Sequence, residues 1–216
     1  MAKKARSQQA DTEIKALGEV ISSTVTTLVA QCWQSEDSDG LLRTDKPNFG
    51  SFLRIECNES QFDVAAVVYN VITGPQDSVH KPSALGLSRQ RLKIEQPHIF
   101  ALLRTEVHAA IIGYALGDRA YHHLPPQPPE VHDFVYPAAP SQIEMITEEF
   151  DFLRLLSTIS EVPSDELLAA AIREAYKARD CDYAFLVSAG QALSNLLRSD
   201  YDRLVCVLRK IRPGVV

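Results

Sequence analysis

Three β-rich segments in the first third of the chain constrain its fold more than any other feature. Residues 17–30 are dominated by Val, Ile and Thr, residues 49–55 read Phe-Gly-Ser-Phe-Leu-Arg-Ile, and residues 64–72 read Val-Ala-Ala-Val-Val-Tyr-Asn-Val-Ile. β-Branched and aromatic residues favour strands, and helix formers are scarce in these segments. We predict three strands of a small closed β-barrel with a glycine-marked turn. A barrel of this kind usually serves for attachment rather than catalysis.

A short helix is predicted after these strands. Ser88 can cap a helix over residues 89–95, because its side-chain oxygen can accept from a backbone N–H of the first turn. Pro97 should break this helix, since the residue before a proline avoids helical geometry. Residues 99–103 can then restart it.

The remaining strands follow in the middle of the chain. Residues 105–115 favour a strand, and residues 120–124 are predicted to return as its hairpin partner after a turn. The segment Leu124-Pro-Pro-Gln-Pro-Pro should be an extended surface ribbon, because proline cannot donate a backbone hydrogen bond. Residues 131–136 then form a last short strand. The barrel should therefore have about six strands.

The composition changes to helical periodicity after Pro140. Apolar residues recur at helical spacing over residues 143–156, Ser164 is placed to cap the next helix, and two more amphipathic helices are predicted over residues 183–197 and 201–211. About four helices are expected. The predicted chain is thus α+β: a disordered arm over residues 1–13, a β-barrel with a short inserted helix over residues 14–140, and a helical domain over residues 141–212.

Charge and hydropathy narrow the class of protein. The 216 residues carry a net charge of −6, with an isoelectric point near 5.5, which is not the clustered positive charge of a nucleic-acid-binding protein. The longest apolar run is too short to cross a bilayer, and the basic start is not followed by the apolar region of a secretory signal. We therefore expect a cytoplasmic protein that does not insert into membranes.

The four cysteines do not form a recognisable framework. Cys32, Cys57, Cys181 and Cys206 are widely spaced and include no Cys-x-x-Cys pair, so neither a disulfide scaffold nor a structural zinc site is predicted. Cys206 lies within Leu-Val-Cys-Val-Leu, where a buried apolar role is expected.

The order of the strands and the proline ribbon resembles the HerA–ATP synthase (HAS) barrel. That small β-barrel stands at the amino end of HerA-type translocases and of the subunits of rotary ATP synthases. The resemblance covers about residues 14–137 and rests on residues 17–21, 49–55, 64–72, 111–114 and 124–132. The chain as a whole also resembles a stand-alone family of such proteins in cyanobacteria.

One departure from the larger relatives decides what the resemblance implies. Those relatives carry an ATPase domain after the barrel, but this sequence contains no Gly-x-x-x-x-Gly-Lys-Ser/Thr loop to hold phosphates. The resemblance therefore implies a barrel that docks to protein without a motor. In the relatives, such barrels pack side by side in a ring or receive a partner enzyme.

Histidines are the strongest candidates for chemistry, and none makes a convincing site. His122, His123 and His132 are close in sequence, but neighbouring strand residues face opposite sides, so they are predicted to be edge or surface residues rather than metal ligands. His108 and Glu106 share one strand face and could form an acid–base pair, although a cross-strand polar contact is the default. No catalytic residue, cofactor or metal is predicted, so the chain is interpreted as a non-enzyme.

Two segments are candidates for binding a partner. The proline ribbon, with Pro125, Pro126, Pro128 and Pro129, could fit an aromatic-lined groove, or it could simply be a rigid strap across the barrel. The last predicted helix, capped by Ser199 or Asp200, has an apolar stripe that could be core or a docking surface. Its candidate partner-binding residues are Tyr201, Leu204, Leu208 and Arg209.

A basic face at the carboxyl end leaves one alternative open. It contains Arg198, Arg203, Arg209, Lys210 and Arg212. It could contact nucleic acid or an acidic partner, but interleaved aspartates favour a solvated amphipathic face.

We therefore expect a non-enzymatic adaptor that binds another protein through the barrel, the helices or both, with self-assembly into a homo-oligomer also possible. The alternative is a nucleic-acid-associated accessory factor related to HerA-type translocases, which the acidic balance disfavours. An enzyme with a hidden site ranks last.

Overall fold

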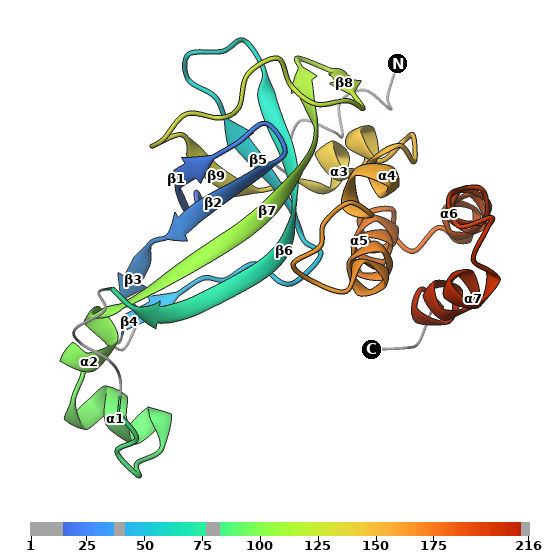
Figure 1. Cartoon of the computed structure of the whole chain (residues 1–216). Helices are drawn as coiled ribbons and strands as arrows, with labels where there is room; N and C mark the ends of the chain where they lie inside the picture. The colour runs from blue at the N-terminus through green and yellow to red at the C-terminus, as the bar shows by residue number, and fades with distance from the viewer. Residues whose placement is uncertain (1–14, 37–41, 77–82, 213–216) are drawn as a thin grey trace, which may run out of the picture.

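Six antiparallel strands close into a barrel, as the sequence predicts. The computed structural model describes residues 15–36, 42–76 and 83–212 (Figure 1). The strands follow one another around the barrel in the order β2-β1-β9-β5-β6-β7, and β7 pairs with β2 to complete the circle. A seventh strand, β8, extends the sheet beyond β7. The predicted amino-terminal arm lies outside the described residues.

The strands vary greatly in length. Two long strands, β6 and β7, cross the barrel side by side, and the others are short. The bounds are β1 Gly18–Ser23, β2 Thr27–Cys32, β5 Phe52–Glu56, β6 Asp63–Pro75, β7 Leu103–Leu116, β8 Arg119–Tyr121 and β9 Phe134–Pro137. A separate pair, β3 (Gln34–Glu36) and β4 (Leu42–Thr44), flanks the predicted loop at residues 35–40, most of which lies outside the described residues.

Seven helices are described. The inserted α1 (Arg89–Glu95) has its predicted bounds, and the Ser88 hydroxyl accepts from the backbone N–H of Arg91 at 3.3 Å. The chain then breaks at Pro97 before a single turn, α2 (His98–Ala101). The carboxyl part contains α3 Pro140–Ile146, α4 Phe152–Leu156, α5 Ser164–Ala178, α6 Tyr183–Leu196 and α7 Tyr201–Lys210.

The inside of the barrel is a core of alternating strand residues. A buried cluster gathers inward side chains from all six strands, including Val20, Leu28, Leu53, Val68 and Ile111. Strand β2 buries every second residue, while β5, β6 and β7 also bury consecutive residues, because their outward side chains are covered as well. Their outward side chains decide what the barrel can contact.

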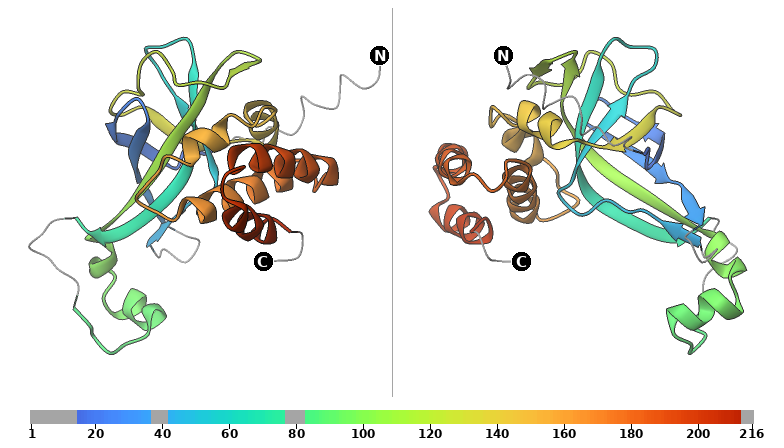
Figure 2. Two further views of the ribbon diagram at one scale, coloured as in Figure 1. Left: turned by 45° about the vertical axis from the view of Figure 1, so that its right-hand side comes forward. Right: turned by 180° about the vertical axis from the view of Figure 1, so that it is seen from behind.

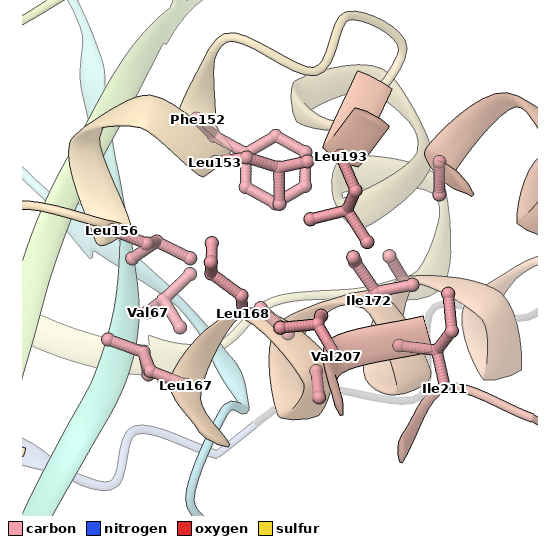
Figure 3. Packing of buried hydrophobic residues seen from close by; sticks show 14 of the residues in the cluster. Val67, Phe152, Leu153, Leu156, Leu167, Leu168, Ile172, Leu193, Val207 and Ile211 are labelled. Carbon is pink, nitrogen blue, oxygen red and sulfur yellow. The ribbon is translucent and has the colours of Figure 1, made fainter. Parts of the chain in front are cut away.

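The helices cover one outer side of the barrel. Outward side chains of β5, β6 and β7, such as Phe52, Val67 and Ile112, join α3 to α7 in a single hydrophobic cluster. Figure 3 shows Val67 lying among leucines of α4 and α5. Helices α6 and α7 pack against α5 on its far side from the barrel (Figure 1). Barrel and helices therefore share a core, and a domain boundary near residue 140 stays a prediction.

At Gly50 the barrel and α5 approach each other closely. Its φ is +85°, a left-handed conformation that side chains disfavour. A Cβ atom at this position would lie 2.5 Å from the Cβ of Ala170 and 2.8 Å from its backbone carbon. The predicted glycine-marked turn is therefore also the place where the helix rests against the barrel.

Several predicted strand bounds differ from those of the structure. The opening segment is two strands rather than one, because Thr24 makes a tight turn: its hydroxyl accepts from the N–H of Thr27 at 3.0 Å. Strand β6 continues through Pro75 instead of ending at Ile72. The last strand begins only at Phe134, because the preceding residues form a turn.

The helical part also differs from the prediction. The periodic segment over residues 143–156 is two helices, since the buried hydroxyl of Thr147 donates back to the Ile143 carbonyl at 2.6 Å where α3 ends. From Pro140 onward the described residues form five helices, where about four were predicted. Pro163, not Ser164, occupies the cap position of α5, and Asp200 rather than Ser199 caps α7, with its carboxylate accepting from the Arg203 N–H at 3.1 Å.

Candidate functional site

The side of the barrel away from the helices has no covering layer among the described residues. Strands β1, β2 and β9 form this side, while α3 to α7 lie against β5, β6 and β7 (Figures 1 and 2). Outward side chains of β1, β2 and β9 are therefore exposed or half-buried in the part of the chain that the structure describes.

Apart from Val25 in the β1–β2 turn, four large apolar side chains are exposed on or beside these strands. Ile21, Trp33, Val131 and Phe134 have 37%, 40%, 51% and 37% of their surface exposed. The rings of Trp33 and Phe134 meet edge to face, with their centroids 5.6 Å apart. We call these four residues, together with Glu19 and His132, the Trp33 face. Exposed aromatic and apolar groups of this kind are typical of protein interfaces.

Strand register places two carboxylates beside the aromatic pair. Phe134 lies directly opposite Glu19 on β1 and directly opposite Glu56 on β5. Cross-strand neighbours point to the same side of a sheet, so the Phe134 ring is flanked by an acidic group on each side. The apolar centre of the Trp33 face therefore has an acidic border.

A strained turn presents part of this face. The Asp133 N–H donates to the Glu130 carbonyl at 3.1 Å, which closes a turn with Val131 and His132 at its two central positions. His132 has a φ of +77°, a value that glycine or asparagine usually supplies at the second central position. The conformation costs free energy, and strain of this kind concentrates at functional sites.

Next to this turn, two residues of one strand oppose a single residue of the other. The His132 N–H donates to the Val20 carbonyl at 2.9 Å, and the Val20 N–H donates to the Asp133 carbonyl at 3.0 Å. This is the hydrogen-bond pattern of a β-bulge, with the left-handed residue in its first position. The bulge turns the side chain of His132 toward β1, where its Nδ1 lies 2.8 Å from the Glu19 carboxylate.

A buried aspartate holds the turn in place. Asp133 is 5% exposed, and its carboxylate accepts from the Glu130 N–H at 2.9 Å and from the Asn58 backbone and side-chain N–H groups at 3.3 and 3.4 Å. A buried carboxylate is stable only when it is hydrogen-bonded in this manner. Asp133 thereby ties the Trp33 face to the loop after β5.

The predicted partner-binding residues of α7 are divided between core and surface. Leu204 is buried and Leu208 packs against the same core, whereas Tyr201 is 75% exposed and Arg209 is exposed. In this conformation α7 therefore offers a partner only part of the predicted set.

Two cations of the predicted basic face hold α7 to α5. Arg203 Nε donates to the Asp165 carboxylate at 2.5 Å, and Lys210 Nζ donates to Glu166 at the same distance. The hydrogen bond to Glu166 raises the pKa of Lys210. These two side chains therefore serve intramolecular packing.

The predicted proline ribbon is partly buried. Pro125 and Pro129 are buried, Pro128 is half-buried, and Pro126 is exposed. Leu124 packs against the barrel core. This burial favours the interpretation of the ribbon as a rigid strap across the barrel, because a segment that binds in the groove of a partner would expose more of its prolines.

The histidines do not converge on one place. His122 Nδ1 and His108 Nε2 are buried without a hydrogen-bond partner among the described residues, and His123 lies against the rings of Tyr114 and Tyr121. Glu106 pairs with Arg104 at 3.0 Å rather than with His108. Within the described ranges no three His, Cys, Asp or Glu side chains are grouped as they would be to hold a metal ion.

The cysteines separate into a buried and an exposed pair. Cys32 and Cys57 are buried in the barrel, where burial raises the pKa of Cys32 to about 11 and that of Cys57 to about 12. Cys181 and Cys206 are exposed. The prediction that Cys206 is buried is wrong: the neighbouring Val207 takes the core position on α7.

A cavity of about 370 Å³ lies at the seam between the barrel and α3. Its walls include Phe52, Arg54 and Asp63 from the barrel and Gln142 and Met145 from α3. The Arg54 guanidinium donates to the Asp63 carboxylate at 3.0 Å and also lies over the Tyr136 ring, 4.5 Å from its centroid. Arg54 and Asp63 thus neutralise each other on the barrel wall, and Asp118 of the β7–β8 turn also lines the cavity.

No family model matches the chain, and no curated protein matches it significantly. Over the described residues, none of the helices has both the length and the apolar character needed to cross a membrane.

The sequence prediction did not include the Trp33 face. Trp33 is the single tryptophan of the chain and follows directly after a strand, which is the one signal that could have pointed to it. Whether an outward strand residue is covered or exposed depends on where the helices pack, and strand periodicity does not contain this information.

Proposed function

We propose that this protein is a non-enzymatic adaptor that docks another protein on the Trp33 face of its barrel. The observation that carries the proposal is the exposed Trp33–Phe134 pair, on the side of the barrel opposite the helices. Tryptophan, tyrosine and arginine dominate the residues that supply binding energy in protein interfaces, and they do so when a partner excludes water around them.

The border of the face indicates the chemistry of the partner. Glu19 and Glu56 flank the Phe134 ring, and the chain as a whole carries a net charge of −6. The partner should therefore present an apolar segment flanked by Lys or Arg, because complementary charge speeds encounter and rejects acidic partners.

Two further considerations support an adaptor. The resemblance to the HAS barrel implies a docking module whose motor is absent, and the turn has His132 at a left-handed position where glycine would fit with less strain. We place this docking function in the cytoplasm. Self-association through the same face is the competing arrangement.

The test is affinity capture of the tagged protein from its own cells, followed by reconstitution with the purified partner. The double variant Trp33→Gln/Val131→Gln removes two exposed apolar side chains of the face. We expect it to lower affinity for the partner by about tenfold or more, since central interface residues contribute more than 1 kcal/mol each.

A matched control removes similar exposed apolar surface elsewhere. Ile94 and Leu116 are 74% and 44% exposed and lie outside the face, so Ile94→Gln/Leu116→Gln should leave affinity unchanged. Urea unfolding of both double variants checks that each is folded. Equal binding by the face variant and the wild type would overturn the proposal, as would light scattering that shows only copies of this chain binding one another through the face.

A further inference from the structure

A small pocket at the α1–α2 end of the barrel has the composition of an anion site. It lies where the ends of β6 and β7 meet the β3–β4 pair and the inserted helices (Figure 1), and its volume is about 120 Å³. Figure 2 shows this end well away from α5, α6 and α7. The pocket is therefore separate from the seam cavity and from the helical core.

Four cationic side chains line this pocket. They are Arg43, Lys46, Arg89 and Lys93, contributed by β4, the turn after it and α1. None of the other described residues that line the pocket is acidic. Asp45 forms an ion pair with Arg43 at 3.2 Å but is not part of the lining. In a chain with a net charge of −6, four cations around so small a volume are a marked local excess.

Two threonine hydroxyls add further donors. Lys46 Nζ donates to Thr73 Oγ1 at 2.5 Å, and Thr73 Oγ1 lies 3.0 Å from Thr105 Oγ1. Thr105 is 3% exposed, so its hydroxyl is a buried polar group within the pocket wall. The two hydroxyls carry two protons and share one hydrogen bond, which leaves one O–H to donate to an acceptor inside the pocket.

The wall of the pocket is held in place by contacts that do not need a ligand. Gln34 Nε2 donates to the carbonyls of Phe100 and Leu103 at 3.0 and 2.6 Å, which fixes α2 against the start of β7. The Arg89 guanidinium lies over the Phe100 ring, 4.9 Å from its centroid. A cation stacked on an aromatic ring is oriented before a ligand arrives, and this lowers the entropy cost of binding.

From these observations we infer that the pocket binds a phosphate group. Lysine, arginine and hydroxyl donors around a confined space match a doubly charged oxyanion, which accepts several charge-assisted hydrogen bonds at once. The volume of about 120 Å³ is well below the ~300 Å³ at which pockets begin to hold drug-sized ligands, so a single phosphate or phosphomonoester group fits better than a nucleotide. The ligand is either inorganic phosphate or a phosphorylated side chain.

The test follows backbone amide resonances of Thr105 and Phe100 in the full-length protein during titration with inorganic phosphate. Ionic strength is held constant by replacing chloride. We expect saturable shifts of these two amides. The double variant Lys46→Gln/Lys93→Gln should weaken phosphate binding by at least about tenfold, because hydrogen bonds to charged groups are among the strong ones.

The control variant removes the same number of positive charges outside the pocket. Lys15 and Arg198 are exposed and do not line it, so Lys15→Gln/Arg198→Gln should bind phosphate within about twofold of the wild type. Arg89→Gln, on an exposed helix, provides a second pocket variant if the double variant fails to fold. If the pocket variant and the control variant lost affinity for phosphate equally, the effect would come from the overall charge of the protein, and the inference would be overturned.

A second arm separates the two sources of the phosphate group. The peptide Gly-Gly-phosphoserine-Gly-Gly is titrated beside its unphosphorylated form. Binding of inorganic phosphate alone supports a free-anion site, and tighter binding of the phosphopeptide supports a phosphorylated side chain. If neither probe shifts Thr105 and Phe100 saturably, the inference fails. This outcome does not affect the proposed docking on the Trp33 face, since neither titration uses a partner protein.

Discussion

The contact between Gly50 and α5 makes a quantitative prediction about how the helices rest on the barrel. In Gly50→Ala, the new side chain would have to adopt a φ of +85°, which costs ~1–2 kcal/mol for a residue other than glycine. Its Cβ would also lie 2.5 Å from Ala170 Cβ and 2.8 Å from the Ala170 backbone carbon. Overlap of this kind in a packed core costs a further ~1–3 kcal/mol.

The sum for Gly50→Ala is roughly 2–5 kcal/mol, a large share of the ~5–15 kcal/mol that stabilises a typical domain. The assay is urea unfolding of the full chain, monitored by tryptophan fluorescence and by circular dichroism. The free energy of unfolding is obtained by linear extrapolation to zero urea. We expect a lower midpoint with an unchanged slope.

Two other glycines separate backbone strain from overlap. Gly117 has a φ of +58° and no atom within 4 Å of a built Cβ, so Gly117→Ala should lose only the ~1–2 kcal/mol of strain. Gly74 has neither a left-handed φ nor a neighbour within 4 Å, so Gly74→Ala should stay within ~0.5 kcal/mol of the wild type. If Gly50→Ala is no less stable than Gly117→Ala, α5 does not press on the turn and the reasoning is refuted.

Three further predictions concern the Trp33 face and the barrel core. Asp133→Ala should lower the free energy of unfolding by ~1–3 kcal/mol in urea, because the Glu130 N–H and the two Asn58 N–H groups lose their acceptor; a variant as stable as the wild type would contradict the anchoring role. His132→Gly should keep or raise stability, by up to ~1 kcal/mol, while partner affinity falls; a clear loss of stability would show that the turn is not strained. Burial raises the pKa of Cys57 to about 12 and that of Cys32 to about 11 from 9.0, so only the unfolded state ionises these thiols as the pH rises past 9. Their contribution to stability is therefore complete below about pH 8 and is lost progressively above about pH 9, and the fall between urea midpoints at about pH 8 and pH 10.5 should be smaller in Cys57→Ala.

Local signals in the sequence predict the parts of the fold that depend on neighbouring residues. The Ser88 cap and Pro97 place α1 correctly because capping and proline geometry act within a few residues. The turn at Thr24 is not predicted, because threonine favours strands and no neighbouring residue marks a turn. In the helical part, the Ile143 carbonyl ends α3 by accepting from a buried hydroxyl, which apolar spacing does not reveal.

The candidate sites depend on long-range packing, so the sequence predicts them poorly. On α7, amphipathic spacing identifies an apolar stripe but does not say that Leu204 faces α5 and the core while Tyr201 stays outside. The four cations of the anion pocket are separated by up to 50 residues and are brought together only when α1 folds back over the strand ends. The Trp33 face likewise exists only because the helices pack on the other side of the barrel.

The sequence by itself determined the α+β class, the barrel of about six strands and the helical character of the carboxyl part, because strand and helix periodicity and proline punctuation are local properties of the chain. The tertiary structure alone decided which outward residues are covered. An outward side chain on a strand is part of the core where a helix packs, as at Val67, and is exposed where none does, as at Phe134. That difference follows from contacts between segments far apart in the sequence, whose free energy no local pattern records.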